Sequence, residues 1–150
     1  MRTWSPEVRT RFREHAATLA SSIAAAHGLH AEVRHIDGYP VTVTDPDETD
    51  FAAGVVQGLL GDDAFAHLLD PLTGSEDFSR VLERVPGSFV GLGATGAGRD
   101  PATAPFNHSA HATFSDDVLP LGAAVYARLA LSRLDVLARR SPVSTDRSPS

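Results

Sequence analysis

The chain of 150 residues contains no cysteine and no lysine. Without cysteine it can form neither a disulfide nor a thiolate metal site or nucleophile, so any metal must be bound by His, Asp or Glu. All 13 basic residues are arginines, scattered along a chain of net charge −6. Because a nucleic-acid-binding protein needs a basic patch or stripe, we expect no nucleic-acid partner.

Long apolar runs are also missing. The N-terminal segment has no apolar central run, so we do not expect a signal peptide. No apolar stretch approaches the ~20 residues that a membrane span needs. With 42% hydrophobic and 21% charged residues, the composition is that of a soluble globular domain. These features predict a cytoplasmic protein without a membrane partner.

Two helices are marked clearly in the first half of the chain. The first begins at Ser5-Pro6-Glu7, which supplies a cap, a proline at the first helical position and an acid at the positive end of the dipole. Its apolar repeat ends near Gly28. The second is predicted to have Asp47 as its cap and to close at Gly61.

Two more helices are predicted in the second half. A short one lies within residues 73–85, with Ser75 as its cap. A long one follows Ser115 or Asp116, with Pro120 tolerated in its first turn. The spacing of its apolar residues predicts an inward face made of Leu121, Ala124, Ala127, Leu131, Leu134 and Ala138.

Strand patterns lie between the helices, at residues 30–36, 41–43, 64–69 and 88–93. Strands that alternate with helices from Asp45 onward predict an α/β fold. The first 44 residues are too few to close a core alone, so the chain begins like the end of something larger. Residues 141–150 are polar and rich in Pro and Ser, and we expect them to be disordered.

The stretch "FNHSAHATFSDD" places His108 and His111 three residues apart in a loop before the last helix. The residues leave two interpretations open: metal ligands, or solvated loop histidines. Neutral imidazoles suit zinc, manganese, cobalt or nickel, but a site needs three or four ligands. Asp116 and Asp117 are expected to start the helix, so a single histidine completed from elsewhere fits better. A triad with Ser109 is rejected because no nucleophile elbow surrounds that serine.

Two glycine-containing segments are candidate ligand sites. In "TGSEDF", the backbone N–H groups of Gly74, Ser75 and Glu76 form either an ordinary helix start or an anion site. "GLGATGAG" lacks the GxGxxG spacing and has no helix directly after it, so it is rejected as a nucleotide site.

Three segments, in this order, resemble the C-terminal part of the M20 family of metal-dependent amidohydrolases, in the branch of hippurate, N-acyl-amino-acid and auxin-conjugate hydrolases. They are "RTWSPEVRTRF" with "GYPVTVTDPDET", then "GSEDFSRVLERVPGSFVGLG", then "HSAHATFSDDVLPLGAAVYARLAL". The resemblance implies an α+β lid or dimerisation domain inserted into an α/β catalytic domain that binds two metals. By that analogy residues 1–40 are the last piece of the lid, residues 41–140 belong to the catalytic domain, and 141–150 form the tail.

The late loop motif of the family reads His-x-Pro-x-aromatic-x-Phe, and its first histidine is a metal ligand. Counting back from Phe114, this position is His108, whereas His111 falls on a variable position. Ala110 replaces the usual proline and Ala112 the usual aromatic residue.

The "GSEDF" segment borders the active site in the family, which implies that Gly74 and Ser75 face substrate. The family's mechanism is attack of a metal-activated water on an amide carbonyl. The other metal ligands and the general-base Glu belong to the N-terminal part of such enzymes and have no counterpart here.

The resemblance therefore implies an amidohydrolase of N-acyl amino acids, present as a C-terminal fragment that is inactive alone and binds metal weakly or not at all. The partner would be a complementing N-terminal part or a second copy in a homodimer. The alternative is a non-catalytic partner subunit or remnant that acts through protein–protein contacts. A third interpretation, an unrelated small α/β binding domain, conflicts with the order and spacing of the three motifs.

Overall fold

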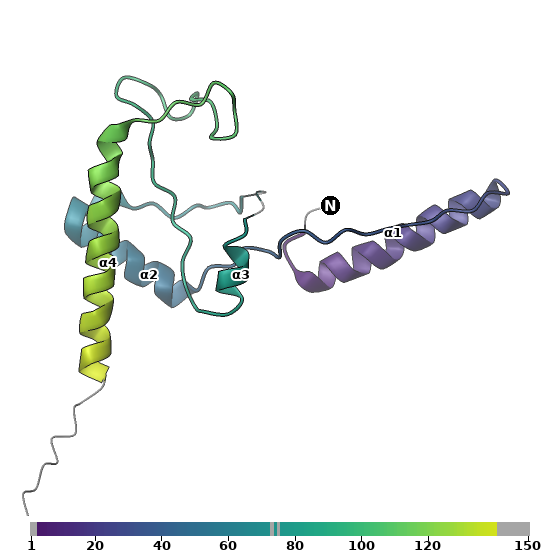
Figure 1. Cartoon of the computed structure of the whole chain (residues 1–150), viewed down its shortest axis with the longest axis horizontal. Helices are drawn as coiled ribbons and strands as arrows, with labels where there is room; N and C mark the ends of the chain where they lie inside the picture. Colours follow the sequence, from purple (N-terminus) through teal and green to yellow (C-terminus); the bar gives the residue numbers. More distant parts are fainter. Residues whose placement is uncertain (1–2, 73, 75, 141–150) are drawn as a thin grey trace, which may run out of the picture. The chain divides into compact units, whose positions relative to one another are not determined.

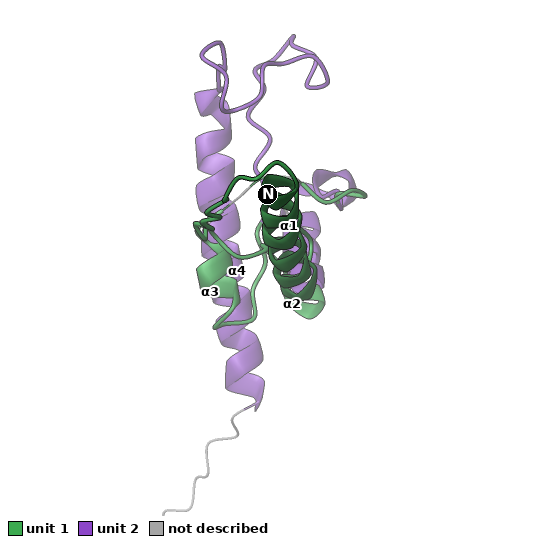
Figure 2. Ribbon diagram, turned by 90° about the vertical axis from the view of Figure 1, so that its right-hand side faces the viewer, with its two compact units in different colours: residues 1–48, 68–89 green, residues 49–67, 90–150 purple. Residues whose placement is uncertain are grey.

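The structure, a computed structural model, describes residues 3–72, 74 and 76–140, and these form helices joined by long irregular segments (Figure 1). The helical elements in chain order are α1 (Pro6–Ala26), α2 (Pro46–Leu60), η1 (Asp62–Ala64), α3 (Ser79–Leu82), η2 (Asp116–Val118) and α4 (Leu119–Arg140). The chain divides into two compact units (Figure 2). The first unit contains residues 1–48 and 68–89, and the second contains residues 49–67 and 90–150.

Helix α1 of the first unit begins and ends where its sequence predicts. The Ser5 hydroxyl accepts a hydrogen bond from the backbone N–H of Val8 at 3.1 Å, with Pro6 at the first helical position. Just beyond the helix, Gly28 has a φ of 66°, which glycine adopts without steric cost. These three local signals are confirmed.

The segment after α1 turns back along the helix, as the dark trace in Figure 1 shows. Two contacts hold it there: Arg13 pairs with Asp37 at 2.8 Å, and the Arg9 guanidinium donates to the backbone oxygen of Tyr39 at 3.1 Å. These arginines therefore connect the helix to the returning chain.

The start of α2 differs from its prediction. The Asp45 carboxylate, not Asp47, accepts from the backbone N–H of Glu48, at 3.0 Å. Pro46 occupies the first helical position, so Asp45 is the residue placed to cap and Asp47 already lies inside the helix. The predicted end is confirmed, because α2 stops at Leu60 and Gly61 follows with a φ of 101°.

The four predicted strands do not form in the described part of the chain. A strand is stable only when a neighbouring strand binds its N–H and C=O groups. Among the described residues, two backbone hydrogen bonds join segments distant in sequence, Asp45 N–H to Gly87 O and Ser115 N–H to Ala94 O, both 2.9 Å. The α/β class is thus not confirmed by these residues, which are helical or irregular.

Helix α4 presents the opposite face to that predicted. Its six less exposed residues are Gly122, Val125, Leu129, Ser132, Arg133 and Val136. The six residues predicted to face inward are all exposed, with Leu131 at 59% and Leu134 at 61%. Both sides of the helix carry apolar residues, and packing within the second unit uses the side nearer Phe51 and Leu92. The predicted inward face is therefore wrong for this chain by itself.

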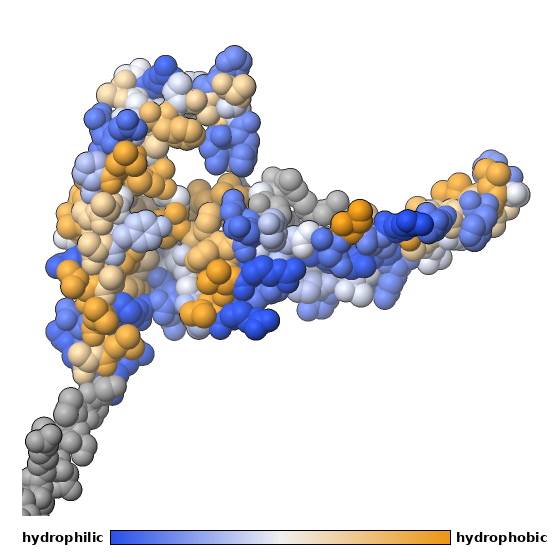
Figure 3. Space-filling view, viewed as in Figure 1, coloured by the Kyte–Doolittle hydropathy of each residue, from blue (hydrophilic) through white to orange (hydrophobic). Residues whose placement is uncertain are grey.

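Few described side chains are buried. Ala52, Ala53 and Val56 of α2 form the buried apolar set, at 4–7% exposure. Apolar side chains, orange in Figure 3, remain visible along α4. None of the helices in the described part of the chain combines the length and apolarity needed to cross a membrane.

Candidate functional site

The loop that carries the two histidines lies in the second unit, between residues 94 and 115. Its base is closed by the hydrogen bond from Ser115 N–H to Ala94 O at 2.9 Å. Across the loop, the Arg99 guanidinium donates to the Thr113 hydroxyl. The Asp100 carboxylate accepts from the N–H of Ala102 at 2.9 Å and forms a turn. Local hydrogen bonds therefore give this irregular segment its shape.

His108 lies in a tight turn of this loop and is exposed. The turn is closed by the N–H of Ser109, which donates to Phe106 O at 2.8 Å. The centre of the His108 ring lies 5.9 Å from that of the Phe106 ring, at an angle of 56°. The aromatic ring thus flanks one side of the imidazole.

His111 is also exposed, and its neighbours form a second turn. Its backbone N–H donates to the Ser109 hydroxyl at 3.1 Å, and the N–H of Ala112 donates to Ser109 O at 3.1 Å. The Ser109 hydroxyl therefore stabilises a turn.

The acidic residues after the loop start the last helix. The Ser115 hydroxyl accepts from the N–H of Asp117 at 3.3 Å and donates to its carboxylate at 3.1 Å. These bonds confirm Ser115 as the helix-start residue, although a turn of 3-10 helix, η2, precedes α4.

The described residues do not make a complete metal site. Nowhere among them do three His, Asp or Glu side chains gather closely enough to hold an ion. A zinc, manganese, cobalt or nickel site needs three or four such ligands. His108 alone does not fit the group, and no catalytic step follows from this chain's residues.

The predicted substrate-facing residues lie in the first unit. Gly74 is exposed, and Ser75 lies outside the described residues, as do residues 141–150. Helix α3 contains only Ser79–Leu82, and its N-cap, Phe78, makes no side-chain cap. Helix α3 therefore begins later than the predicted first turn at Glu76 and Asp77, and the predicted cap, Ser75, lies outside the described residues. A substrate contact by Gly74 stays a prediction.

No sequence pattern indicates the buried hydroxyl at the start of α3. Ser79 is fully buried, and its hydroxyl donates to the backbone oxygen of Glu76. This bond closes the turn that precedes the helix. Nothing in the local pattern distinguishes Ser79 from an ordinary exposed helix serine.

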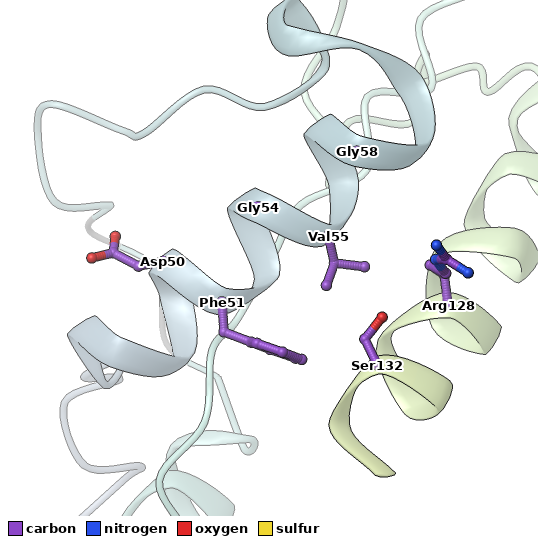
Figure 4. Close-up of a pocket in the computed structure, with 7 residues that line it drawn as sticks. All are labelled: Asp50, Phe51, Gly54, Val55, Gly58, Arg128 and Ser132. Carbon is purple, nitrogen blue, oxygen red and sulfur yellow. The ribbon is translucent and has the colours of Figure 1, made fainter. Parts of the chain in front are cut away.

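A shallow pocket of about 360 Å³ lies between α2 and α4 in the second unit (Figure 4). Phe51 and Val55 point from α2 towards α4, whereas Asp50 points away. The other lining residues are Gly54, Gly58, Arg128 and Ser132. The two glycines, four residues apart, leave the α2 surface open. This pocket is not among the sites expected from the sequence, and the glycine spacing is the pattern that indicates it.

The family model of peptidase family M20/M25/M40 matches residues 6–132, and the chain belongs to this family. M20 is an α/β family whose enzymes typically use divalent metals.

Individual relatives agree with the family match. Thermostable carboxypeptidase 2 of Saccharolobus solfataricus is 34% identical over 132 residues, which cover 87% of this chain and 32% of the relative. The IAA-amino acid hydrolase ILR1-like 2 of Arabidopsis thaliana is 33% identical over 139 residues, covering 90% of the chain and 31% of the relative. N-acetylcysteine deacetylase of Bacillus subtilis is 29% identical over 137 residues, 91% of the chain and 33% of the relative. The chain thus spans about a third of the length of these relatives.

Proposed function

We propose that this chain is the C-terminal portion of an M20 amidohydrolase that cleaves the amide bond of N-acyl amino acids, and that it is inactive by itself. The observation that carries the proposal is the family match over residues 6–132, which spans only about a third of the relatives. The names of two relatives, an IAA-amino acid hydrolase and an N-acetylcysteine deacetylase, support an acylated amino acid as substrate. We also propose a cytoplasmic location, on the composition described above.

In this proposal His108 supplies one ligand of a divalent metal site that residues of an N-terminal part complete. Its exposed position in a tight turn supports this role, because neither ring nitrogen has to leave a packed core to bind an ion. His111 is a bystander, and Gly74 and Ser75 face the substrate. The lid piece is residues 1–40 and the catalytic piece residues 41–140.

The isolated chain tests the claim of inactivity. We expect no hydrolysis of N-acetyl amino acids in the presence of zinc or manganese, and weak or absent binding of either metal in calorimetry. Tight binding of two ions per chain, with turnover that is lost in His108→Ala, contradicts this claim.

A chimera tests the role of His108 directly. Residues 6–132 would replace the matched segment of thermostable carboxypeptidase 2, which supplies the rest of the chain. In a folded, active chimera we expect His108→Ala to lower kcat/KM by at least ~100-fold. Even the mutation of an outer-shell partner of a metal ligand lowers metal affinity or activity by about 10- to 100-fold. The matched control, His111→Ala, should leave kcat/KM unchanged. Equal effects of the two substitutions contradict the assignment.

A second candidate function is a non-catalytic partner subunit or remnant that acts through protein–protein contacts. The observation that favours it is the incomplete ligand set among the described residues, next to a helix, α4, with an exposed apolar face. The chimera separates the two candidates. An active chimera supports the hydrolase portion, whereas a folded but inactive chimera supports a remnant that is no longer under selection for catalysis.

A further inference from the structure

Asp37 and Gly38 form the single Asp-Gly pair of the chain. Both residues are exposed and lie in the irregular segment that returns along α1 (Figure 1). A Cβ built on Gly38 would meet no atom within 4 Å, and the N–H of Gly38 donates no hydrogen bond to any residue that the structure describes. The backbone nitrogen that follows Asp37 is therefore neither crowded by a side chain nor held in place.

The side chain of Asp37, unlike the Gly38 nitrogen, is restrained. One guanidinium nitrogen of Arg13 on α1 lies 2.8 Å from one carboxylate oxygen of Asp37 and 3.2 Å from the other. The pair is open to water, because 61% of the Asp37 side chain is exposed. An exposed ion pair of this kind contributes little to stability, but it holds the two side chains in one geometry.

We propose that Asp37 is a site of spontaneous isomerisation to isoaspartate, and that the ion pair with Arg13 slows the reaction. The Gly38 nitrogen forms a bond to the side-chain carboxyl carbon of Asp37. A C–O bond of that carboxyl group breaks, and its oxygen leaves as water with the amide proton and one carboxyl proton. Water then opens the cyclic imide at the backbone carbonyl of Asp37 and leaves isoaspartate. Nothing is oxidised or reduced, and solvent water is the only co-reactant.

The residues on either side of the reacting carbon act in opposite directions. Glycine favours ring closure, because the attacking nitrogen carries a Cα without a side chain. The irregular backbone lets this nitrogen turn towards the carboxyl carbon. Arg13 opposes the closure, because the carboxyl group has to leave the guanidinium before it turns towards Gly38. The rate in the folded chain therefore depends on how often the ion pair opens.

The product does not keep the contact with Arg13 unchanged. Isoaspartate lengthens the backbone by one carbon, and its free carboxylate is attached directly to Cα, which shortens its reach. The hydrogen bond from Arg9 to Tyr39 O lies just beyond the lengthened link. Isomerisation therefore loosens the returning segment. This inference is independent of the hydrolase proposal, because the reaction is internal to two adjacent residues and involves no metal, substrate or partner.

Peptide mapping with electron-transfer fragmentation tests the proposal, because it distinguishes isoaspartate from aspartate. After incubation of the full chain for weeks near neutral pH, we expect isoaspartate at Asp37 and much less at Asp135, which lies inside α4 before a valine. Arg13→Gln should speed the reaction about two- to fivefold, the size of effect that an exposed ion pair allows. The matched control Arg11→Gln, which replaces an exposed arginine of α1 without an ion pair among the described residues, should leave the rate unchanged.

Unfolding and salt separate the ion pair from other effects of the substitution. In urea, the wild type and Arg13→Gln should isomerise at the same rate. In the folded chain, added salt should raise the rate of the wild type but not that of Arg13→Gln, because salt screens an exposed pair. Gly38→Ala should slow the reaction in both states, since a Cβ crowds the attacking nitrogen. Trypsin should cut after Arg34 faster in the aged wild type than in aged Gly38→Ala, because the returning segment is looser.

Three results overturn the proposal. The first is the absence of isoaspartate at Asp37 from both the wild type and Arg13→Gln. The second is an equal rate in the folded wild type and folded Arg13→Gln, which leaves the ion pair without a protective role. The third is a difference between these two proteins that persists in urea, because the effect then does not come from the folded contact.

Discussion

The guanidinium carbon of Arg133 on α4 lies 3.9 Å from the centre of the Phe51 ring on α2. Both side chains are half-buried, and both belong to the second unit. A cation over an aromatic face is attracted by the quadrupole of the ring, more strongly where water is partly excluded. This contact joins the two longest helical segments of the second unit at the edge of the pocket.

Replacing Phe51 tests the strength of this contact. We expect Phe51→Leu to lower the free energy of unfolding by about 0.5–2 kcal/mol, because leucine keeps apolar contact but removes the ring. A double-mutant cycle with Arg133→Met in urea isolates the pair. The control Tyr126→Leu, which removes an exposed aromatic ring from α4, should change stability by less than about 0.5 kcal/mol. A coupling free energy of zero contradicts the contact.

The capping of α2 gives a paired prediction. Asp45→Ala should cost about 1 kcal/mol, because it leaves the N–H of Glu48 without its carboxylate acceptor. Asp47→Ala should cost only a few tenths of a kcal/mol, since that residue contributes mainly through the helix dipole. Urea denaturation followed by circular dichroism measures both. A larger loss of stability for Asp47→Ala than for Asp45→Ala would support Asp47 as the N-cap, as the sequence predicts.

Two glycines of the α2 region should respond in opposite directions. Gly61 has φ 101° and ψ 162°, a region that other residues rarely enter, so Gly61→Ala should cost about 1–3 kcal/mol. Gly54 lies inside α2, and a Cβ there meets no atom within 4 Å. Gly54→Ala should therefore stabilise the chain by about 0.5–1 kcal/mol. Thermal unfolding of the two variants checks the pair, and a shift of the same sign in both would contradict it.

The contacts at the start of α1 predict that the stability of this helix depends on pH. The pKa of the Glu7 carboxyl is lowered from its ordinary value of 4.5. The larger cause is a hydrogen bond from the backbone N–H of Glu7, and the smaller is a hydrogen bond from the Ser5 hydroxyl. Because the pKa is lowered in the folded chain, the carboxylate stabilises the helix above the unfolded pKa, and this contribution is lost as the pH falls through the folded pKa.

An NMR titration of the Glu7 carboxyl tests this. Ser5→Ala should raise its pKa towards 4.5, whereas Ser5→Thr, which keeps a hydroxyl, should leave it low. Glu7→Gln should remove this part of the acid dependence of α1. A pKa of Glu7 that does not change in Ser5→Ala contradicts the role of the cap.

The bond across the histidine loop can be tested by proteolysis. Thr113→Val keeps the shape of the side chain but removes the hydroxyl that accepts from Arg99. We expect faster cleavage within residues 94–115, because a bond that limits loop opening is lost. Thr113→Ser, which keeps the hydroxyl, should be cleaved at the wild-type rate. Equal rates in all three proteins show that the bond does not restrain the loop.

The helix ends were the most predictable part of the fold. Ser5, Gly28 and Gly61 act through their own neighbours, because a cap or a positive φ needs only a few adjacent residues. The prediction of Asp47 as the cap is wrong because two acids flank Pro46, and either fits the composition of a helix start. The position of a cap depends on which residue leaves the helical conformation, and sequence spacing alone does not decide that.

The predicted strands are absent among the described residues for a different reason. Residues 30–36 and 88–93 have the pattern of strands, but a strand depends on a partner that supplies its hydrogen bonds. Among the described residues no such partner is present, so these segments stay irregular. The candidate site shares this property. The family resemblance assigns His108 by its spacing from Phe114, whereas the local sequence indicates no further ligand.

The sequence by itself determined both ends of α1, the end of α2, Ser115 at the start of the last helix, and the family to which the chain belongs. The tertiary structure decided which side of each helix is covered. Helix α4 has apolar residues on two opposite sides, and periodicity cannot rank them, because burial depends on which neighbour lies within reach. Contacts with Phe51 and Leu92 cover one side, and the side with Leu131 and Leu134 remains exposed.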